Sequence, residues 1–424
     1  MSQAKDADDP YGTEQEHPHE LWYAAMELHG VRPGSTIELD PDALAWPRPF
    51  SSATAGSWRV SARLLRDGTP LLRGAVVERV FDPPHAGTID LRLDAEVPAM
   101  PPVVESGSIK VLRIESKHLS AFYGRPVFLE GVVELPPSYA TDSRRRYPTA
   151  YMMSGFGGTL AYQAGRDAEL MKQRSPEHYP EMIWVRFSEM LPTGNHVFAD
   201  SLGDGPWGTA LVEELIPELE RKYRAIPAAR ARLLTGQSSG AWAALWLQIT
   251  HPDFFGGAWP VAPDPVDFRS WLGANVTPGS TDNVFVTREG KPRNLWRDRG
   301  QEIFSVEEYV RLEQVLAGPG ALDTFNWVFS PRGPSGLPER LFDPTTGVQN
   351  PEVQKAWARW DVHRVLEDGW TRLGPKLAGK LHVFVGSDDS FHLNESVALL
   401  CDFLAKKGSG GACELVPGKN HFDV

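Results

Sequence analysis

The segment Gly236-Gln-Ser-Ser-Gly240 constrains the fold more than any other part of the chain. It follows a strand-like run at 230–235 and opens an apolar run at 239–250, in which bulky side chains recur at spacings of three and four. The glycines leave room for a sharp turn that exposes the Ser238 hydroxyl. We therefore predict a strand, a turn and a helix with Ser238 as an attacking group; the alternative is a turn serine before a packed helix.

A nucleophilic serine needs an acid that orients its base, and the chain offers two candidates after a later strand. Residues 380–386 form a candidate strand that ends at Asp388 and Asp389, before a predicted helix at about 394–407. Adjacent side chains at a strand end point in opposite directions, so either carboxylate could face the base. We take Asp389 as the acid and keep Asp388 as the alternative.

The candidate base is His421. It follows a short candidate strand at 412–416 and stands near the end of the sequence, in the chain order serine, acid, histidine. The ordinary pKa of a histidine lies near neutral pH, so a neutral ring can take the Ser238 proton and return it to a leaving alkoxide. We therefore assign His421 as the general base.

A glycine-rich loop supplies the last requirement, a pair of backbone N–H groups that can bind an oxyanion. Residues 147–153 are typical of a buried strand, which runs into Ser154-Gly-Phe-Gly-Gly158. We expect one donor from Phe156 and the other from Ser239, with Gly155 and Gly157 close to the substrate. A phosphate-binding loop is disfavoured, because no Lys-Ser or Lys-Thr pair follows the glycines.

Taken together, these motifs resemble those of the putative-esterase family of α/β-hydrolases, which includes S-formylglutathione hydrolases, enterobactin esterases, feruloyl esterases and mycolyltransferases. The resemblance covers about residues 120–424. One departure is Ser154, which stands where many hydrolases have histidine. The motifs that carry the resemblance are the segments at 151–158, 195–208, 236–240, 251–255, 386–389 and 420–422.

The resemblance implies an α/β-hydrolase fold with a central, mostly parallel sheet, and a serine hydrolase that cleaves a carboxylic ester. Ser238, Asp389 and His421 would form its catalytic triad, Phe156 and Ser239 its oxyanion hole, and no cofactor would be needed. The substrate would be a small-molecule ester, such as an acylated sugar, a phenolic ester or a siderophore ester. An acyltransferase, a peptidase of the same fold and a non-catalytic glycan-binding scaffold remain alternatives.

Composition narrows the class of protein further. The 424 residues are 41% hydrophobic, carry a formal net charge of −12, and contain no apolar run of the roughly 18 residues that a membrane span needs. The negative charge argues against nucleic acid and anionic membrane as partners. The start of the sequence lacks a signal-peptide pattern, so we expect a cytoplasmic protein, with a secreted or periplasmic mature form left open. The sequence does not determine the oligomeric state.

The pattern of polar and apolar residues along the chain predicts three structural regions. Residues 1–20 are polar and are expected to be a disordered tail, and 21–106 alternate in short apolar runs typical of a small antiparallel β-sandwich domain. Residues 107–424 would be the catalytic domain, with an insertion at about 268–370 that contains a helix at 306–316. The tryptophans of this insertion either fill a second small core or stack on substrate rings.

Two further features concern single side chains. The only cysteines are Cys401 and Cys413, which we expect to be free and partly buried, with one bridge between them as the alternative. Trp207 precedes a predicted helix at 209–223 and follows a loop expected at the active-site end of the sheet. We therefore take Trp207 as a candidate substrate-binding residue.

Overall fold

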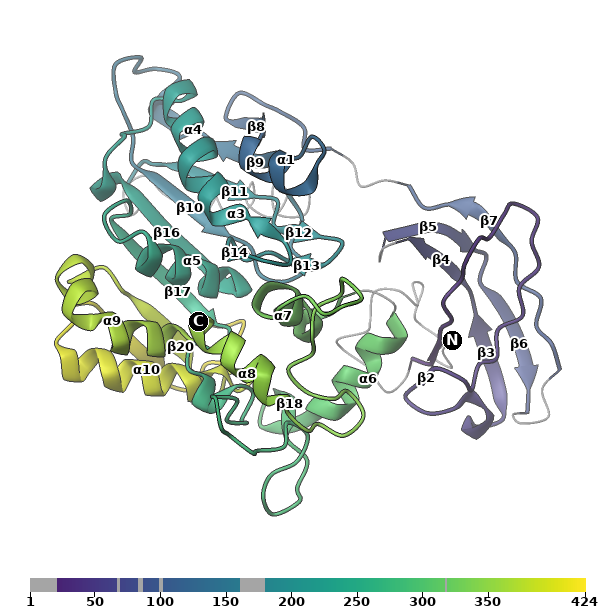
Figure 1. The fold of residues 1–424 in the computed structure, drawn as a ribbon. Helices are drawn as coiled ribbons and strands as arrows, with labels where there is room; N and C mark the ends of the chain where they lie inside the picture. The colour runs from purple at the N-terminus through teal and green to yellow at the C-terminus, as the bar shows by residue number, and fades with distance from the viewer. Residues whose placement is uncertain (1–20, 67–68, 83–86, 99–101, 161–179, 317–318) are drawn as a thin grey trace. The chain divides into compact units, whose positions relative to one another are not determined.

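A computed structural model describes residues 21–66, 69–82, 87–98, 102–160, 180–316 and 319–424 (Figure 1). The predicted disordered tail, residues 1–20, lies outside this part of the chain. Contacts divide the chain into two units, one formed by Met1–Ala99 with Glu308–Gly320 and the other by Met100–Glu307 with Ala321–Val424. Residues 308–320 of the predicted insertion therefore group with the N-terminal part of the sequence.

The N-terminal unit contains small antiparallel sheets, as the alternating apolar pattern predicts. Two strands pair in one sheet, three in a second, and a two-residue pair forms a third. Its buried core is formed by Trp22, Phe50, Trp58 and neighbouring aliphatic side chains, and the three rings meet edge to face. The strands are β1 Tyr23–Ala24, β2 Ala45–Trp46, β3 Gly56–Val60, β4 Arg63–Arg66, β5 Thr69–Gly74, β6 Val77–Phe81 and β7 Leu93–Glu96.

An eight-stranded sheet forms the centre of the larger unit, with the strand order β21-β20-β17-β16-β10-β11-β9-β8 (Figure 1). The six strands from β21 to β11 run parallel, and β9 and β8 add two antiparallel pairings at one edge. The predicted α/β-hydrolase sheet is thus confirmed. Its strands are β8 Ile109–Glu115, β9 Phe128–Glu134, β10 Thr149–Met153, β11 Ile183–Phe187, β16 Arg232–Ser238, β17 Gly257–Pro263, β20 Val383–Gly386 and β21 Cys413–Val416.

Helices pack along this sheet, α5 against β16 and β17, and α10 against β20 and β21. The predicted helices at 239–250 and 306–316 are present with the same bounds. In the described part of the chain, no helix combines the length and apolarity that crossing a membrane requires. The helices are α1 Lys117–Tyr123, α3 Trp207–Ala210, α4 Ile216–Lys222, α5 Ser239–Thr250, α6 Val306–Leu316, α7 Ala321–Phe329, α8 Pro351–Trp357, α9 Val362–Leu377 and α10 Leu393–Lys407.

The helix predicted at 209–223 differs from an ordinary α-helix. A π-helical turn, Leu211–Leu215, separates α3 from α4. Pro217 lies just beyond this turn and lacks an N–H. In a regular α-helix its ring would clash with the carbonyl of Glu213. The wider turn accommodates the proline without ending the helical segment.

Aromatic side chains of the insertion form a buried core against α5. Trp271 and Trp357 are each 1% exposed, and their rings lie 5.8 Å apart. Phe329 of α7 packs against Trp242 of α5 at 5.1 Å between ring centroids. These side chains are therefore packed inside the protein, in agreement with the second-core interpretation rather than with ring stacking on a substrate.

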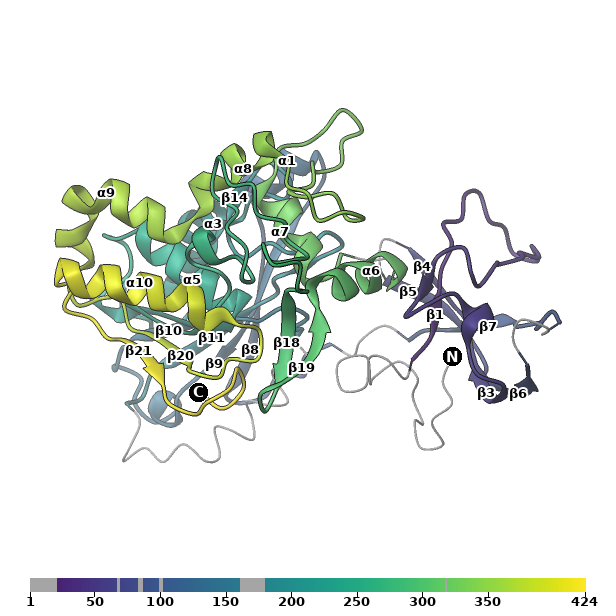
Figure 2. The same ribbon diagram turned by 90° about the horizontal axis from the view of Figure 1, so that it is seen from below.

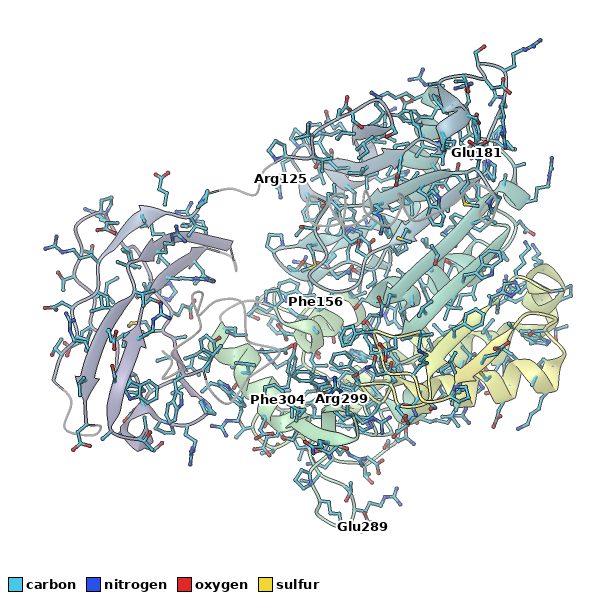
Figure 3. All side chains as sticks on the ribbon, turned by 180° about the vertical axis from the view of Figure 1, so that it is seen from behind. Arg125, Phe156, Glu181, Glu289, Arg299 and Phe304 are labelled. Carbon is cyan, nitrogen blue, oxygen red and sulfur yellow. A yellow bond between two sulfur atoms is a disulfide. The ribbon has the colours of Figure 1, made fainter. Side chains whose placement is uncertain are left out.

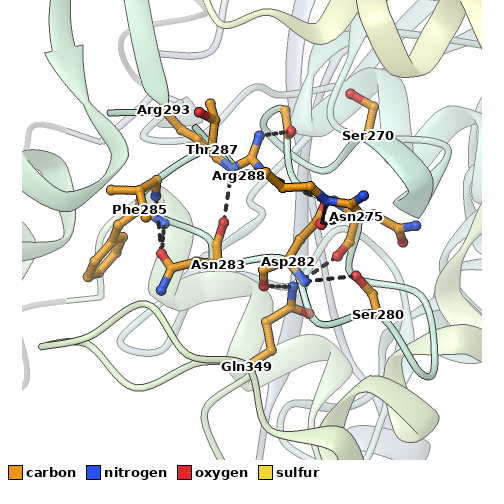
Figure 4. Close-up of polar contacts among 12 residues, drawn as sticks. Ser270, Asn275, Ser280, Asp282, Asn283, Phe285, Thr287, Arg288, Arg293 and Gln349 are labelled. Atoms are coloured by element: carbon orange, nitrogen blue, oxygen red, sulfur yellow. Dashed lines mark hydrogen bonds and ion pairs between the residues drawn. The ribbon is translucent and has the colours of Figure 1, made fainter. Parts of the chain in front are cut away.

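The insertion also contains a hairpin and an irregular loop. The hairpin pairs β18 Asn294–Asp298 with β19 Gln301–Ser305 (Figure 2). The loop before it is held by side chains that bind backbone carbonyls, including Arg293 Nε to Asn283 O at 2.9 Å and Gln349 Nε2 to Asp282 O at 2.6 Å (Figure 4). Such bonds satisfy the carbonyl groups of a segment that lacks a sheet or helix partner.

The expectation of two free cysteines is wrong, because Cys401 and Cys413 form a disulfide. Cys401 lies in α10 and Cys413 begins β21, with their Cα atoms 5.2 Å apart. Gly408 ends α10 in a left-handed conformation, φ 62°, which turns the chain back toward the sheet. The short return places the strand beside the helix, so the two sulfur atoms meet.

Replacing both cysteines by alanine should lower the free energy of unfolding by about 3 kcal/mol, the effect expected when a short closed loop is opened. Urea denaturation of the oxidised wild type and of the Cys401→Ala/Cys413→Ala variant measures the difference. The wild type unfolded in reductant is the control and should behave like the variant. Equal stability of the variant and the oxidised wild type would contradict the disulfide.

Candidate active site

The predicted serine turn lies between β16 and α5, and Ser238 is the last residue of the strand. Its backbone has φ 57° and ψ −126°, a conformation that costs a non-glycine residue free energy. The flanking glycines are required by close backbone contact. A Cβ on Gly236 would lie 2.9 Å from Met153 O, and one on Gly240 would lie 2.7 Å from Ser154 O. The turn is thus pressed against the end of β10.

The glycine-rich loop after β10 lies beside this turn. A Cβ on Gly155 would be 3.7 Å from the Cβ of Ser238. Gly157 has φ 77°, and the N–H of Gly158 donates to Gly155 O at 3.1 Å, so the loop closes in a tight turn. Figure 3 labels Phe156 in this loop. The three predicted loop positions and the serine therefore occupy one end of the sheet.

Two backbone N–H groups at this point are candidates to bind an anion. Ser239 is the first residue of α5, so its N–H has no partner within the helix. Among the described residues, none accepts a hydrogen bond from the Phe156 N–H. The N-terminal end of a helix also favours negative charge. The pair predicted as oxyanion donors is therefore available.

The acid and the base form a buried pair. His421 Nδ1 lies 2.9 Å from Asp389 Oδ2, with side chains 3% and 0% exposed. The other carboxylate oxygen of Asp389 accepts the N–H groups of Phe391 and Leu393. Asp388, the alternative acid, is exposed, and its backbone N–H donates to a carbonyl. Of the two candidates, Asp389 is the one that contacts His421.

Two contacts hold the histidine loop, one from the serine turn and one from the end of β20. The Gln237 side chain, adjacent to Ser238, donates from Nε2 to His421 O at 2.7 Å. At Gly386, the end of β20, a Cβ would collide with the carbonyl of Lys419. The backbone around His421 is therefore fixed from both β16 and β20.

The hairpin of the insertion supports the acid. Arg297 in β18 donates from Nε to Asp389 O at 3.0 Å, and its N–H donates to Ser390 O at 2.8 Å. Phe391 continues this loop, and its ring meets the His421 ring edge to face at 4.8 Å. The insertion thus contacts the loop that carries Asp389, and Phe391 of the same loop packs against His421.

A buried carboxyl supports the oxyanion loop. Glu189 is fully buried, and its Oε1 accepts the Ser154 N–H at 2.6 Å, while the Asn195 side chain donates to Ser154 O at 3.4 Å. Burial raises the pKa of Glu189 to about 8, although hydrogen bonds from Ser154 and Asn195 lower it. Glu189 therefore holds the start of the loop as a largely protonated acid at neutral pH.

Trp207, the remaining candidate, is 4% exposed. Its ring stacks on His196 at 4.0 Å between centroids, and its Nε1 donates to Asp204 O at 2.7 Å. These are contacts of a packed side chain. A role of Trp207 in substrate binding stays a prediction.

A second carboxyl beside the nucleophile was not expected from the sequence. Ser238 Oγ donates to Asp264 Oδ1 at 3.4 Å, and Asp264 follows β17, the strand next to β16. Burial raises the pKa of Asp264 to about 6, against lowering by the hydroxyls of Ser239 and Ser238 and by His421. An aspartate directly after the neighbouring parallel strand was the available sequence signal. Glu189, Gln237 and Arg297 have no comparable local pattern.

Glu189→Gln should raise the free energy of unfolding, and by more as the pH rises. The native pKa near 8 exceeds the ordinary 4.5, so between these values the native state keeps a proton that the unfolded state releases. Stability of the wild type therefore falls through this window on account of Glu189, and glutamine removes the effect. Urea denaturation across the same window measures it. Glu414→Gln at an exposed position is the control; a stability difference that stays constant with pH would contradict the prediction.

The chain is similar to several solved structures of hydrolases and to one protein-family model. Three solved structures illustrate the likeness: a ferulic acid esterase (16% identity, TM-score 0.45, 74% of this chain and 92% of that chain), serine hydrolase F of Staphylococcus aureus (14%, 0.43, 75% and 92%) and an S-formylglutathione hydrolase from Agrobacterium tumefaciens (16%, 0.42, 76% and 91%). At these TM-scores the likeness carries no functional inference. No curated protein matches the chain. Residues 129–325 match the model of the putative-esterase family, and the predicted resemblance to this family is confirmed.

Proposed function

We propose that the protein hydrolyses a small-molecule carboxylic ester through an acyl-enzyme on Ser238. His421 takes the hydroxyl proton as Oγ attacks the carbonyl carbon, and it then gives the proton to the leaving alkoxide. The N–H groups of Phe156 and Ser239 bind the oxyanion. Water, deprotonated by the same histidine, releases the acid and restores the serine.

The observation that carries this proposal is the buried Asp389–His421 pair beside a serine on a strained turn. The 2.9 Å contact at Nδ1 leaves Nε2 of His421 as the nitrogen that can accept a proton. Asp389 stabilises the imidazolium that forms in this step. The Gln237 bond to His421 O joins this pair to the residue next to the nucleophile.

The oxyanion donors favour acyl transfer over other uses of a serine. Both N–H groups belong to the backbone of a tightly packed turn, so they need little reorganisation when negative charge develops on the carbonyl oxygen. Water and an alcohol can both attack an acyl-enzyme. Product analysis with and without an added sugar acceptor therefore distinguishes a hydrolase from a transferase, and matched ester and amide substrates distinguish it from a peptidase.

An active-site probe tests the nucleophile. A fluorophosphonate should label the wild type at one site, and peptide mapping should place the label on Ser238. Labelling should disappear in Ser238→Ala and persist in Ser335→Ala, a control at an exposed turn serine. A folded wild type that stays unlabelled would contradict the proposal.

The two adjacent aspartates allow a matched test of the acid. Asp389→Asn should lower kcat for p-nitrophenyl acetate by roughly 10³ to 10⁴, because the amide cannot orient His421 as a carboxylate does. Asp388→Asn should leave kcat within about twofold, because its exposed side chain makes no contact with the base. Equal effects of the two substitutions would remove Asp389 from its proposed role. Circular dichroism confirms that both variants fold.

A further inference from the structure

The strand order places candidate functional groups in a row at the carboxyl end of the sheet. In the order β20-β17-β16-β10, the carboxyl ends of neighbouring strands carry Asp389, Asp264, Ser238 and the oxyanion loop. Asp264 therefore stands on the opposite side of Ser238 from the glycine-rich loop that carries Phe156. It is also on the side from which the acid and the base approach.

Asp264 is bound to the nucleophile by two contacts. Ser238 Oγ donates to Asp264 Oδ1 at 3.4 Å, and the backbone N–H of Asp264 donates to Ser238 O at 3.4 Å. The β16–β17 register shifts between Gln237 and Ser238, and Ser238 then pairs with Pro263, so the irregularity brings the two side chains together. The nucleophile's hydroxyl donates to this carboxyl; among the described residues it has no hydrogen bond to His421.

The surroundings of Asp264 contain little that would neutralise it. It is 8% exposed, its Oδ2 has no hydrogen-bond partner among the described residues, and none of the described arginines and lysines forms an ion pair with it. The titratable groups that face it are His421, which favours its ionised form, and Asp389, which opposes it. The other polar neighbours are the hydroxyls of Ser238 and Ser239.

We propose that Asp264 is a second catalytic proton acceptor for Ser238, in parallel with His421. The inference rests on the proposed function. As Oγ attacks the ester carbon, the O–H bond of Ser238 breaks and its proton passes to Oδ1, while the carbonyl π electrons move to the oxyanion. The proton then goes to the alkoxide oxygen as the carbon–oxygen bond of the leaving group breaks.

Charge balance favours a carboxylate that accepts the proton over one that only holds the serine. A carboxylate that stayed ionised beside Ser238 would repel the negative charge that develops on the substrate. When Asp264 takes the proton it becomes neutral as the oxyanion forms, so this repulsion disappears in the same step. A general base works best when its pKa lies near the working pH, and the pKa of about 6 meets this condition.

The test compares a variant that lacks the histidine with a variant that lacks both the histidine and the Asp264 carboxylate. The rate of fluorophosphonate labelling at Ser238 is measured against pH for His421→Ala and for His421→Ala/Asp264→Asn. The single variant should retain slow labelling that rises as Asp264 ionises, at a pH above about 6, because the loss of His421 removes a group that favours the ionised form. The double variant should label at least tenfold more slowly and lose this rise, because an amide has no proton-accepting charge.

Controls separate this inference from the proposed function. His421→Ala/Asp388→Asn should match His421→Ala, because it removes an exposed carboxylate next to the acid. If His421→Ala is unlabelled at every pH, or if the single and double variants share one rate profile, Asp264 is not a proton acceptor. If instead the wild type is unlabelled, the proposed function itself fails. Circular dichroism checks folding, and Asp264→Ser replaces Asp264→Asn if the amide variant does not fold.

Discussion

The close approach of the serine turn to the end of β10 is the contact on which the site depends. Neither Gly236 nor Gly240 can carry a Cβ, because the Met153 and Ser154 carbonyls occupy that space. One packing contact therefore sets the distance between the nucleophile and the loop that carries the oxyanion donor. The strain at Ser238 is offset by α5, which is buried along most of its length and begins at the next residue.

Because the neighbouring strands are parallel, the groups at their carboxyl ends lie in a row beside this contact. Neighbouring strands end at the same edge, so β20, β17, β16 and β10 deliver an acid, a second carboxyl, the serine and the oxyanion loop in sequence. The cost of this arrangement is electrostatic, because Asp264 and Asp389 are buried near one another. The resulting rise in the pKa of Asp264 follows mainly from burial, with Asp389 adding to it.

Local sequence patterns predicted those features that depend on a short segment of the chain alone. The turn glycines and the helix at 239–250 follow from spacing within a few residues, and the structure contains them. The acid and the histidine were found from their places after successive candidate strands. The sequence favoured Asp389 over Asp388 but left both open, since the choice depends on which carboxyl faces a histidine 32 residues away. The roles of Asp264 and Glu189 could not be predicted, because they arise from packing against other strands. The disulfide was kept only as the alternative, because it depends on a helix and a later strand packing side by side.

The part of the insertion that belongs to the larger unit packs against the elements that carry the candidate acid and nucleophile. Its aromatic core contacts the helix that begins at the nucleophile, through Phe329 and Trp242, and its hairpin binds the acid loop through Arg297. A change within the insertion can therefore move the acid or the serine helix without touching either. In the proposed mechanism, a substitution that disturbs this packing lowers kcat by moving the acid or the serine.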